Sequence, residues 1–401
     1  MTTIDEMMPI PAALDAERPF GLSAGLACLA AASLSALLLA APAKAADPIE
    51  IGMSVALTGY LASFDGQVVD GAKLAVKRVN DAGGADGHEL RLHILDNASN
   101  ATTGVTVTNQ LLNQFNVAVM INGASSAQSV AILPIAARNK VPFITTSQLP
   151  PQPVWAFLAG PAYEEVLERQ LQFAKQRLKA KKIAFLYSQT PYGQNGAKLL
   201  AKRAPELGLE IVFLEGAEGS VTDLTPQVSK AKDAQPDALL DFFTGPIHIV
   251  EAKAAATVGL TVPIIMAHDD SAVASQAAAN FANSYNVVLA VQAFPNIQDA
   301  QLKKANGDFL KIYEAAKLDP AGVGGASWGW DAVYTLVTAV TETHGVSGEP
   351  LRAALEKVDF FGTTAHYKFT PSDHTGQVET GKGLQIGQFK SGKVEIVDSG
   401  S

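Results

Sequence analysis

The sequence predicts an α/β fold built from two parallel-sheet units in tandem. Short apolar segments alternate with amphipathic helical segments along residues 49–146, and the same alternation begins again near residue 182. Such alternation is typical of a parallel sheet with helices on both faces. Polar or aromatic residues follow several of the expected strands, at the edge where open α/β sheets bind ligands. The two units therefore predict two rims that face one another across a cleft.

The first unit is expected to contain four strands and two helices. In its first helix, Val68, Ala72 and Val79 form an apolar stripe, and Lys73 lies outside that stripe, as in an amphipathic helix. The expected strands are 49–56, 89–96, 117–123 and 141–146, and the expected helices are 67–80 and 127–139.

The second unit repeats the pattern and is followed by a helical region and a hairpin. Its expected strands are 182–188, 209–215, 238–244, 262–269 and 286–294, with helices at 193–207, 222–233, 247–258 and 271–283. Two further helices are expected at 298–317 and 327–343. The segment LQIGQFKSGKVEIV predicts a hairpin that turns at Ser391 and Gly392.

The N-terminal segment is typical of a secretion signal. Residues 23–42 are uncharged and rich in Ala and Leu, and Ala43-Lys44-Ala45 provides a cleavage site of the small-x-small type. Cleavage is expected near Ala45. The only cysteine, Cys28, lies within this segment, so the processed chain has no disulfide. An exported protein cannot rely on ATP or reduced nicotinamide, which favours capture of a solute over its chemical conversion.

Composition narrows the classes of partner. The net charge is −9 for the whole chain and −7 after residue 45, because the first 45 residues carry two basic and four acidic side chains. A mildly acidic chain has no electrostatic footprint for nucleic acid. The seven histidines show no metal-ligand spacing. We therefore expect no nucleic acid, metal or cofactor, and about 355 residues suffice for two domains.

Several short motifs together resemble one protein family. The first helix ends in Asn80-Asp81-Ala82-Gly83-Gly84, and Asp96 closes the next expected strand. The remaining matches are Gly87, Gly123 before Ser125-Ser126, Pro191-Tyr192-Gly193, and Trp330-Asp331-Ala332. With these motifs the chain resembles the type I periplasmic solute-binding proteins of branched-chain amino acid (leucine, isoleucine and valine) ABC transporters, over nearly all of 47–398.

The resemblance implies an architecture and a mode of action. It implies two lobes joined by three crossovers, a hinge that closes on a small acid, and docking on an ATP-driven permease in the inner membrane. The protein is then expected to be a periplasmic monomer and not an enzyme. Residues 1–45 form the signal peptide, 46–163 with 294–363 form lobe one, and 164–293 with 364–401 form lobe two.

The resemblance also implies ligand-binding positions. Ser125 and Ser126 match the hydroxyls that hold the ligand carboxylate together with backbone N–H groups at a helix start. Asp269 aligns with the acid that pairs with a ligand ammonium group. The other expected ligand-binding residues are Phe64, Thr145, Thr146, Ser147, Tyr192 and Thr244.

One departure from the family bears on the ligand. Amino-acid binders of this family usually have an Asn-Pro turn with a nearby Thr after the strand that ends at Ile144, whereas this chain has Leu149 where the hydroxyl is expected. The sequence therefore favours a small apolar or aromatic carboxylate, with a branched-chain amino acid as the alternative. Further residues expected around such a ligand are Tyr60, Phe243, His268 and Phe294.

Other interpretations stay open at this point. Gly325-Ala326-Ser327-Trp328-Gly329 fits the nucleophile elbow of a secreted serine hydrolase, which would use Ser327 with a later Asp and His366 or His374, although the motif needs a strand before it. A sensory module would use the same closed shape. Ser125 could simply cap a helix. The helical spacing of Trp328 and Trp330 predicts a packing role for both.

Overall fold

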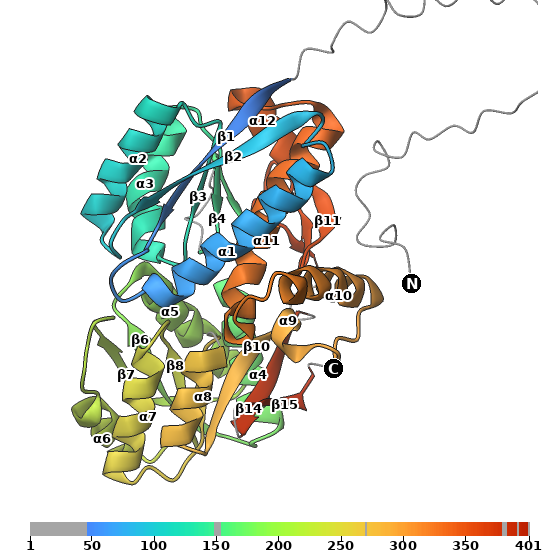
Figure 1. Ribbon diagram of the computed structural model, residues 1–401. Coiled ribbons are helices and arrows are strands. Elements are labelled where there is room, and N and C mark those ends of the chain that lie inside the picture. The colour runs from blue at the N-terminus through green and yellow to red at the C-terminus, as the bar shows by residue number, and fades with distance from the viewer. Residues whose placement is uncertain (1–45, 148–153, 269–270, 379–382, 391–392, 400–401) are drawn as a thin grey trace, which may run out of the picture.

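The computed structural model describes residues 46–147, 154–268, 271–378, 383–390 and 393–399, and it contains two large sheets (Figure 1). The predicted signal segment and the predicted turn at Ser391 and Gly392 lie outside these residues. We call the five-stranded sheet with its packed helices lobe one, and the seven-stranded sheet with its packed helices lobe two. The prediction of a two-unit α/β fold is confirmed.

Lobe one is a parallel sheet with strand order β2-β1-β3-β4-β5. Helices α2 and α3 pack together on one face, over an apolar cluster that includes Leu111, Met120 and Ile132. Helices α1 and α11 pack along one another on the other face (Figure 1). The elements are β1 (Ala46–Val55), α1 (Ala62–Asp81), β2 (His88–Asp96), α2 (Ala101–Phe115), β3 (Val119–Asn122), α3 (Ser126–Arg138), β4 (Phe143–Thr145) and β5 (Ala156–Leu158).

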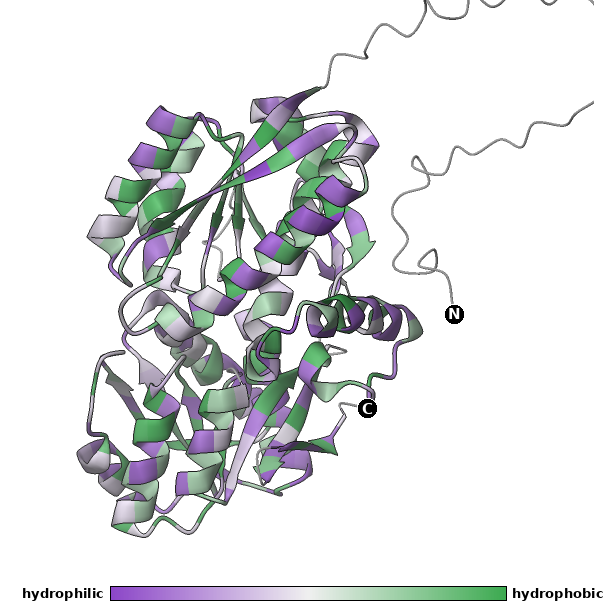
Figure 2. Cartoon of the chain, viewed as in Figure 1, coloured by the Kyte–Doolittle hydropathy of each residue, from purple (hydrophilic) through white to green (hydrophobic). Residues whose placement is uncertain are grey.

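Lobe two has strand order β15-β14-β10-β9-β8-β6-β7, in which β14 runs antiparallel to both of its neighbours and the other paired strands are parallel. Helices α6, α7 and α8 cover one face, and α4 and α5 cover the other. Hydrophobic residues gather on the strands and on the sides of the helices that face them (Figure 2). The elements are α4 (Tyr163–Gln176), β6 (Lys182–Ser188), α5 (Pro191–Glu206), β7 (Glu210–Ala217), α6 (Thr225–Asp233), β8 (Ala238–Phe242), α7 (Ile247–Val258), β9 (Ile264–Met266), α8 (Ser271–Asn280) and β10 (Ser284–Leu289).

The chain crosses between the lobes three times: from β5 to α4, from β10 towards α11, and from β13 to β14. The third crossover follows a small antiparallel sheet of β11, β12 and β13. The remaining elements are α9 (Ala290–Ala293), α10 (Ala300–Ala315), a 3-10 turn η3 (Pro320–Gly322), α11 (Val323–Thr343), α12 (Gly348–Leu355), β11 (Asp359–Phe361), β12 (His366–Lys368), β13 (Gln377–Val378), β14 (Leu384–Lys390) and β15 (Lys393–Asp398).

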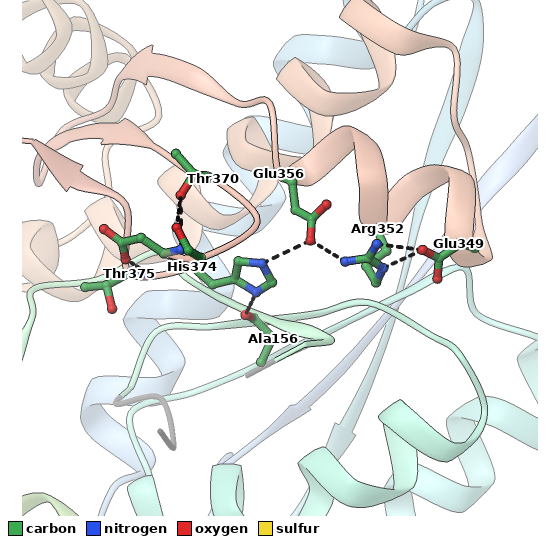
Figure 3. A network of polar contacts seen from close by, with 9 residues as sticks. Ala156, Glu349, Arg352, Glu356, Thr370, His374 and Thr375 are labelled. Carbon is green, nitrogen blue, oxygen red and sulfur yellow. Dashed lines mark hydrogen bonds and ion pairs between the residues drawn. The ribbon is translucent and has the colours of Figure 1, made fainter. Parts of the chain in front are cut away.

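Polar contacts hold the segment before the third crossover on lobe one. His374 is buried, and its two ring nitrogens lie 2.9 Å from the carbonyl oxygen of Ala156 and 3.4 Å from a Glu356 carboxylate oxygen (Figure 3). The buried Asp331 of α11 accepts hydrogen bonds from the backbone amides of Thr363 and Thr364, at 2.8 and 2.9 Å. The motif residue Asp331 therefore anchors the turn between β11 and β12 to α11.

The differences from the predicted elements are local. Helices α2, α4 and α12 and strand β5 were not predicted, and the expected strand 286–294 ends at Leu289 because the helix α9 follows. The chain from Leu57 to Leu61 is the loop after β1, so Phe64 lies inside α1. None of the described helices is long and apolar enough to span a membrane.

Candidate functional site

A pocket lies between the carboxyl-end rims of the two sheets. It encloses about 660 Å³ of space not occupied by protein atoms, counting the part that opens to solvent. Lobe one and the first crossover contribute Tyr60, Leu61, Phe64, Ala124, Ser125, Ser126, Thr146, Ser147, Pro161, Tyr163 and Trp328, and lobe two contributes Thr190, Tyr192, Thr244, Gly245 and His268.

The first turn of α3 forms the polar part of the lobe-one wall. Ser125 is the N-cap residue of this helix, and its hydroxyl oxygen accepts a hydrogen bond from the amide of Gln128 at 3.3 Å. Ser126 follows as the first helical residue, and both serines line the pocket. The start of a 13-residue helix carries partial positive charge and unpaired N–H groups, an arrangement that favours a bound anion.

A buried aspartate beneath this wall fixes its position. The carboxylate of Asp65 accepts hydrogen bonds from the amides of Ala56, after β1, and Ala124, directly before Ser125, at 2.7 and 2.8 Å. Asp65 is fully buried, and burial raises its pKa to about 6, although both hydrogen bonds act in the opposite direction. A side chain at Gly123 would overlap the Asp65 carboxylate, so this close approach requires glycine.

A second buried aspartate lies behind the lobe-two wall. Asp241, near the end of β8, accepts a hydrogen bond at 2.9 Å from the amide of Ala267, the residue before His268. A longer contact of 3.5 Å comes from the amide of Phe243, the residue before Thr244. Burial alone would raise the pKa of Asp241, but the charge and hydrogen bond of His248, together with hydrogen bonds from Glu251 and the Ala267 amide, outweigh burial, and the net pKa lies below its usual value.

Stacked rings line the apolar part of the pocket and connect the lobes. The rings of Phe64 and Trp328 meet edge to face with their centroids 4.8 Å apart. Trp328 also packs on the ring of His268 of lobe two, at a centroid distance of 5.2 Å. His268 meets Tyr192 at 6.4 Å, and Tyr192 stacks on Phe242 at 4.4 Å. The indole N–H of Trp328 finds no acceptor in the described part of the chain, so a ligand oxygen could accept it.

The two walls touch directly. The hydroxyl oxygen of Ser126 accepts a hydrogen bond from the backbone amide of Tyr192 at 3.2 Å, and this bond joins α3 of lobe one to α5 of lobe two. With the contact between Trp328 and His268, this hydrogen bond shows that the two rims are closed upon one another.

Known proteins share this architecture. A family model described as "Periplasmic binding protein" matches residues 48–393. This chain belongs to the periplasmic binding protein family. "Leu/Ile/Val-binding protein homolog 1" of Brucella abortus is 24% identical over 327 residues, which cover 78% of this chain and 83% of that protein. The predicted family and the solute-binding role are therefore confirmed.

Solved structures with the same fold include an extracellular ligand-binding receptor from Rhodopseudomonas palustris HaA2, with a TM-score of 0.80, 21% identity, and coverage of 88% of this chain and all of that chain. LivJ from Streptococcus pneumoniae in complex with isoleucine gives 0.73 at 24% identity, with coverage of 88% and 99%. A solute-binding protein from R. palustris in complex with benzoate gives 0.71 at 19% identity, with coverage of 88% and 96%. At these sequence identities, the structural similarity shows that the proteins share a fold.

Most of the predicted ligand-binding positions of this family lie at the pocket. The predicted residues in its lining are Tyr60, Phe64, Ser125, Ser126, Thr146, Ser147, Tyr192, Thr244 and His268. Asp269 and Leu149 lie outside the described residues, so those two predictions are untested.

Three predicted residues are not part of the pocket lining. Thr145 is buried beneath it, where its hydroxyl accepts a hydrogen bond from the amide of Ser147 at 3.0 Å. Phe243 points into the core of lobe two, because neighbouring residues at a strand end face opposite sides and Thr244 takes the pocket side. Phe294 follows α9, is 37% exposed and lies away from the pocket.

The sequence missed several lining residues, of which Trp328 matters most. Its helical spacing with Trp330 predicted packing, which is right for the buried Trp330 but incomplete for Trp328. Tyr163 begins the first crossover helix, and burial followed by the charge of Glu164 raises the pKa of its hydroxyl. The remaining missed lining residues are Leu61, Ala124, Pro161, Thr190 and Gly245.

The hydrolase interpretation of Ser327 is wrong. Ser327 lies within α11 and is fully buried, and its hydroxyl donates to the carbonyl oxygen of Gly324 at 2.6 Å. A nucleophile elbow needs an exposed serine at a turn between a strand and a helix. Ser327 instead follows the 3-10 turn η3 on the same helical run.

Proposed function

We propose that the pocket binds a small apolar or aromatic carboxylate and that closure of the lobes encloses it. The observation that carries this proposal is the pairing, in one lining, of the α3 N-terminus with the rings of Phe64 and Trp328. The helix start and the serine hydroxyls suit a carboxylate, whereas the rings suit an apolar body. Burial within the closed lobes strengthens these polar contacts.

The charges of the lining support the same ligand class. Among the described lining residues none is Lys, Arg, Asp or Glu. A carboxylate would therefore be held by amides, hydroxyls and the indole N–H of Trp328, and the described lining offers no carboxylate to an ammonium group. The solved R. palustris protein in complex with benzoate has the same fold.

A branched-chain amino acid is the alternative ligand. It is favoured by the name of the B. abortus relative and by the isoleucine in S. pneumoniae LivJ. Its ammonium group would need an anionic partner, for which Asp269 is the predicted residue. Phe64, Ser125, Ser126, Thr146, Ser147, Tyr192 and Thr244 would contact either ligand.

The ligand class can be tested by thermal unfolding with added ligands. A compound that binds only the folded chain raises the melting temperature by mass action. We expect benzoate or cinnamate to raise it more than leucine or isoleucine at equal concentration. A rise with leucine and isoleucine only would show that the proposed ligand class is wrong.

Tryptophan fluorescence adds a local test. Ligand binding should change the emission of Trp328, so a Trp328→Phe variant should lose most of the signal. Trp155 serves as the matched control, because it directly precedes β5, packs against Arg352 and is not part of the pocket lining. A signal that survives in Trp328→Phe and disappears in Trp155→Phe would place the ligand elsewhere.

The cellular role follows from the family. We infer a non-enzymatic, monomeric protein that is cleaved near Ala45, works in the periplasm and delivers its solute to an ABC permease in the inner membrane. The lobe boundaries at residues 163, 293 and 363 are part of this proposal. N-terminal sequencing of the exported protein tests the cleavage site, and uptake of labelled solute with and without the permease tests the role.

A further inference from the structure

Three ionisable side chains form a fully buried cluster behind the lobe-two wall. Asp241 lies near the end of β8, and His248 and Glu251 lie in the first two turns of α7. A ring nitrogen of His248 and one carboxyl oxygen each of Asp241 and Glu251 lie within 4.8 Å of one another. Burying this much charge is unfavourable unless the cluster is neutral as a whole.

The hydrogen bonds indicate which carboxyl group is ionised. Asp241 accepts from the amide of Ala267 and faces Nδ1 of His248, each at 2.9 Å. Neither carboxyl oxygen of Glu251 receives a hydrogen bond from a donor within the described residues. Two carboxyl groups that face one another in a fully buried site cannot both be ionised, so the proton belongs on the one that lacks donors among the described residues.

We propose that Glu251 is held as a neutral carboxylic acid whose O–H donates a hydrogen bond to the Asp241 carboxylate, and that this pair is a positioning device for the lobe-two wall of the pocket. Asp241 receives the amides of Ala267 and Phe243, and the residues that follow them, His268 and Thr244, line the pocket. The positioning role rests on the function proposed above, whereas the location of the proton does not.

The surroundings are consistent with this assignment. Burial, followed by the negative charge of Asp241, raises the pKa of Glu251 well above its usual value. Within the described ranges, the charged or titratable groups clustered with Glu251 are Asp241 from β8 and His248 from α7. Gln170 of α4 contributes only an uncharged amide, which donates at 2.9 Å to the carbonyl oxygens of Asp241 and Ile265.

The protonated acid makes stability depend on pH in a definite direction. A carboxyl whose pKa is raised by folding binds its proton more tightly in the folded chain, so it favours the folded state below its usual pKa. That contribution is lost as the pH rises towards the folded pKa. A Glu251→Gln variant keeps a hydrogen-bond donor to Asp241 but cannot titrate, so it should be spared this loss.

The first experiment is thermal unfolding of ligand-free protein between pH 5 and pH 9. Relative to the wild type, the melting temperature of Glu251→Gln should rise by about 2 °C or more as the pH increases. Glu314→Gln, an exposed change on α10, should follow the wild type. Parallel curves for the wild type and Glu251→Gln at every pH would overturn the proposal.

The metal content of the same samples separates a proton from a cation. A divalent cation held by these three ligands would also neutralise the cluster. About one zinc or other divalent ion per wild-type chain, lost in Glu251→Gln, would overturn the proposal, whereas metal well below stoichiometric amounts supports it.

Hydrogen exchange tests the positioning role without a ligand. In Glu251→Ala, exchange of the Ala267 amide should become faster by about tenfold or more, whereas Glu251→Gln should restore it to within about twofold of the wild type. Unchanged exchange in Glu251→Ala, or no rescue by Glu251→Gln, would overturn the role. Because no ligand is added, a failure here is distinct from a failure of the proposed ligand class.

Discussion

Asp65 in lobe one and Asp241 in lobe two occupy matching places in the molecule. Each is fully buried at the carboxyl-end rim of its sheet, and each accepts backbone amides from two strand ends. In lobe one the amide of Ala124 directly precedes the pocket residue Ser125, and in lobe two both amides directly precede pocket residues, Thr244 and His268. Parallel sheets thus use the same device twice to fix loops whose backbone groups have no strand partner.

The two aspartates differ in how their charge is balanced. Asp241 faces His248 and a carboxyl that can donate to it, and its pKa is lowered despite burial. Among the described residues only backbone amides donate to Asp65, and burial raises its pKa to about 6. The lobe-one wall should therefore respond to pH in the mildly acidic range, where Asp65 gains or loses its proton. The Asp241 carboxylate should stay ionised over the same range.

Removal of the Asp241 charge should have the largest effect. Asp241→Asn leaves His248 without its buried carboxylate, and breaking a buried ion pair typically destabilises a protein by about 3–5 kcal/mol. Urea denaturation at pH 7 measures the change in the free energy of unfolding. Asp233→Asn, an exposed change on α6, is the control and should have almost no effect. A loss below about 1 kcal/mol would contradict the ion pair.

The Asp65→Asn change should show a smaller, pH-dependent effect. Because folding raises the pKa of Asp65 from 3.8 to about 6, the wild type is favoured by the bound proton at low pH and loses that advantage as the pH rises between these values. The wild type should therefore lose about 3 kcal/mol relative to Asp65→Asn over this range. Denaturation curves at several pH values from 4 to 7 measure the difference. A constant difference would mean that Asp65 titrates normally.

Crowding the Asp65 site should lower the free energy of unfolding by a smaller amount again. A Cβ at Gly123 would overlap the Asp65 carboxylate, so Gly123→Ala should displace that carboxylate and destabilise the chain by about 1–3 kcal/mol. Gly66→Ala is the matched control, because Gly66 lies in α1 with open space where a Cβ would lie, and this variant should gain up to about 1 kcal/mol. Equal effects in the two variants would argue against tight packing around Asp65.

The sequence predicted the fold and the rims because both depend on local patterns. Alternating apolar strands and amphipathic helices placed most elements within a few residues, strand ends identified Ser125 and Thr244 as pocket residues, and the resemblance to the family implied Tyr192. Phe243 was misplaced because the two sides of a strand end cannot be distinguished without the register of the sheet.

The supporting residues could not be predicted in this way. The roles of Asp65 and Asp241 depend on backbone amides that are distant in the sequence and that the fold places within hydrogen-bond distance of them. Neither aspartate has a local sequence signal. Trp328 reaches the pocket from α11, far along the chain, and its helical spacing is the same whether it packs or lines a cavity. The sites where local reasoning fails are thus those that depend on contacts between segments far apart in the sequence.

The smallest predicted effect concerns the place where the two walls meet. The hydroxyl oxygen of Ser126 accepts the amide of Tyr192 across the pocket at 3.2 Å, so Ser126→Ala removes one hydrogen bond that exists only between the lobes. A neutral hydrogen bond contributes about 1 kcal/mol, which corresponds to about a fivefold loss of ligand affinity with little change in the melting temperature of the free protein. Calorimetry with the acid that gives the largest thermal shift measures the affinity. Ser129→Ala is the control, because the partners of Ser129 in the described part of the chain, Ser125, Asn122 and Thr145, all belong to lobe one. An equal loss of affinity in both variants would mean that Ser126 acts through the packing of α3 and not through closure.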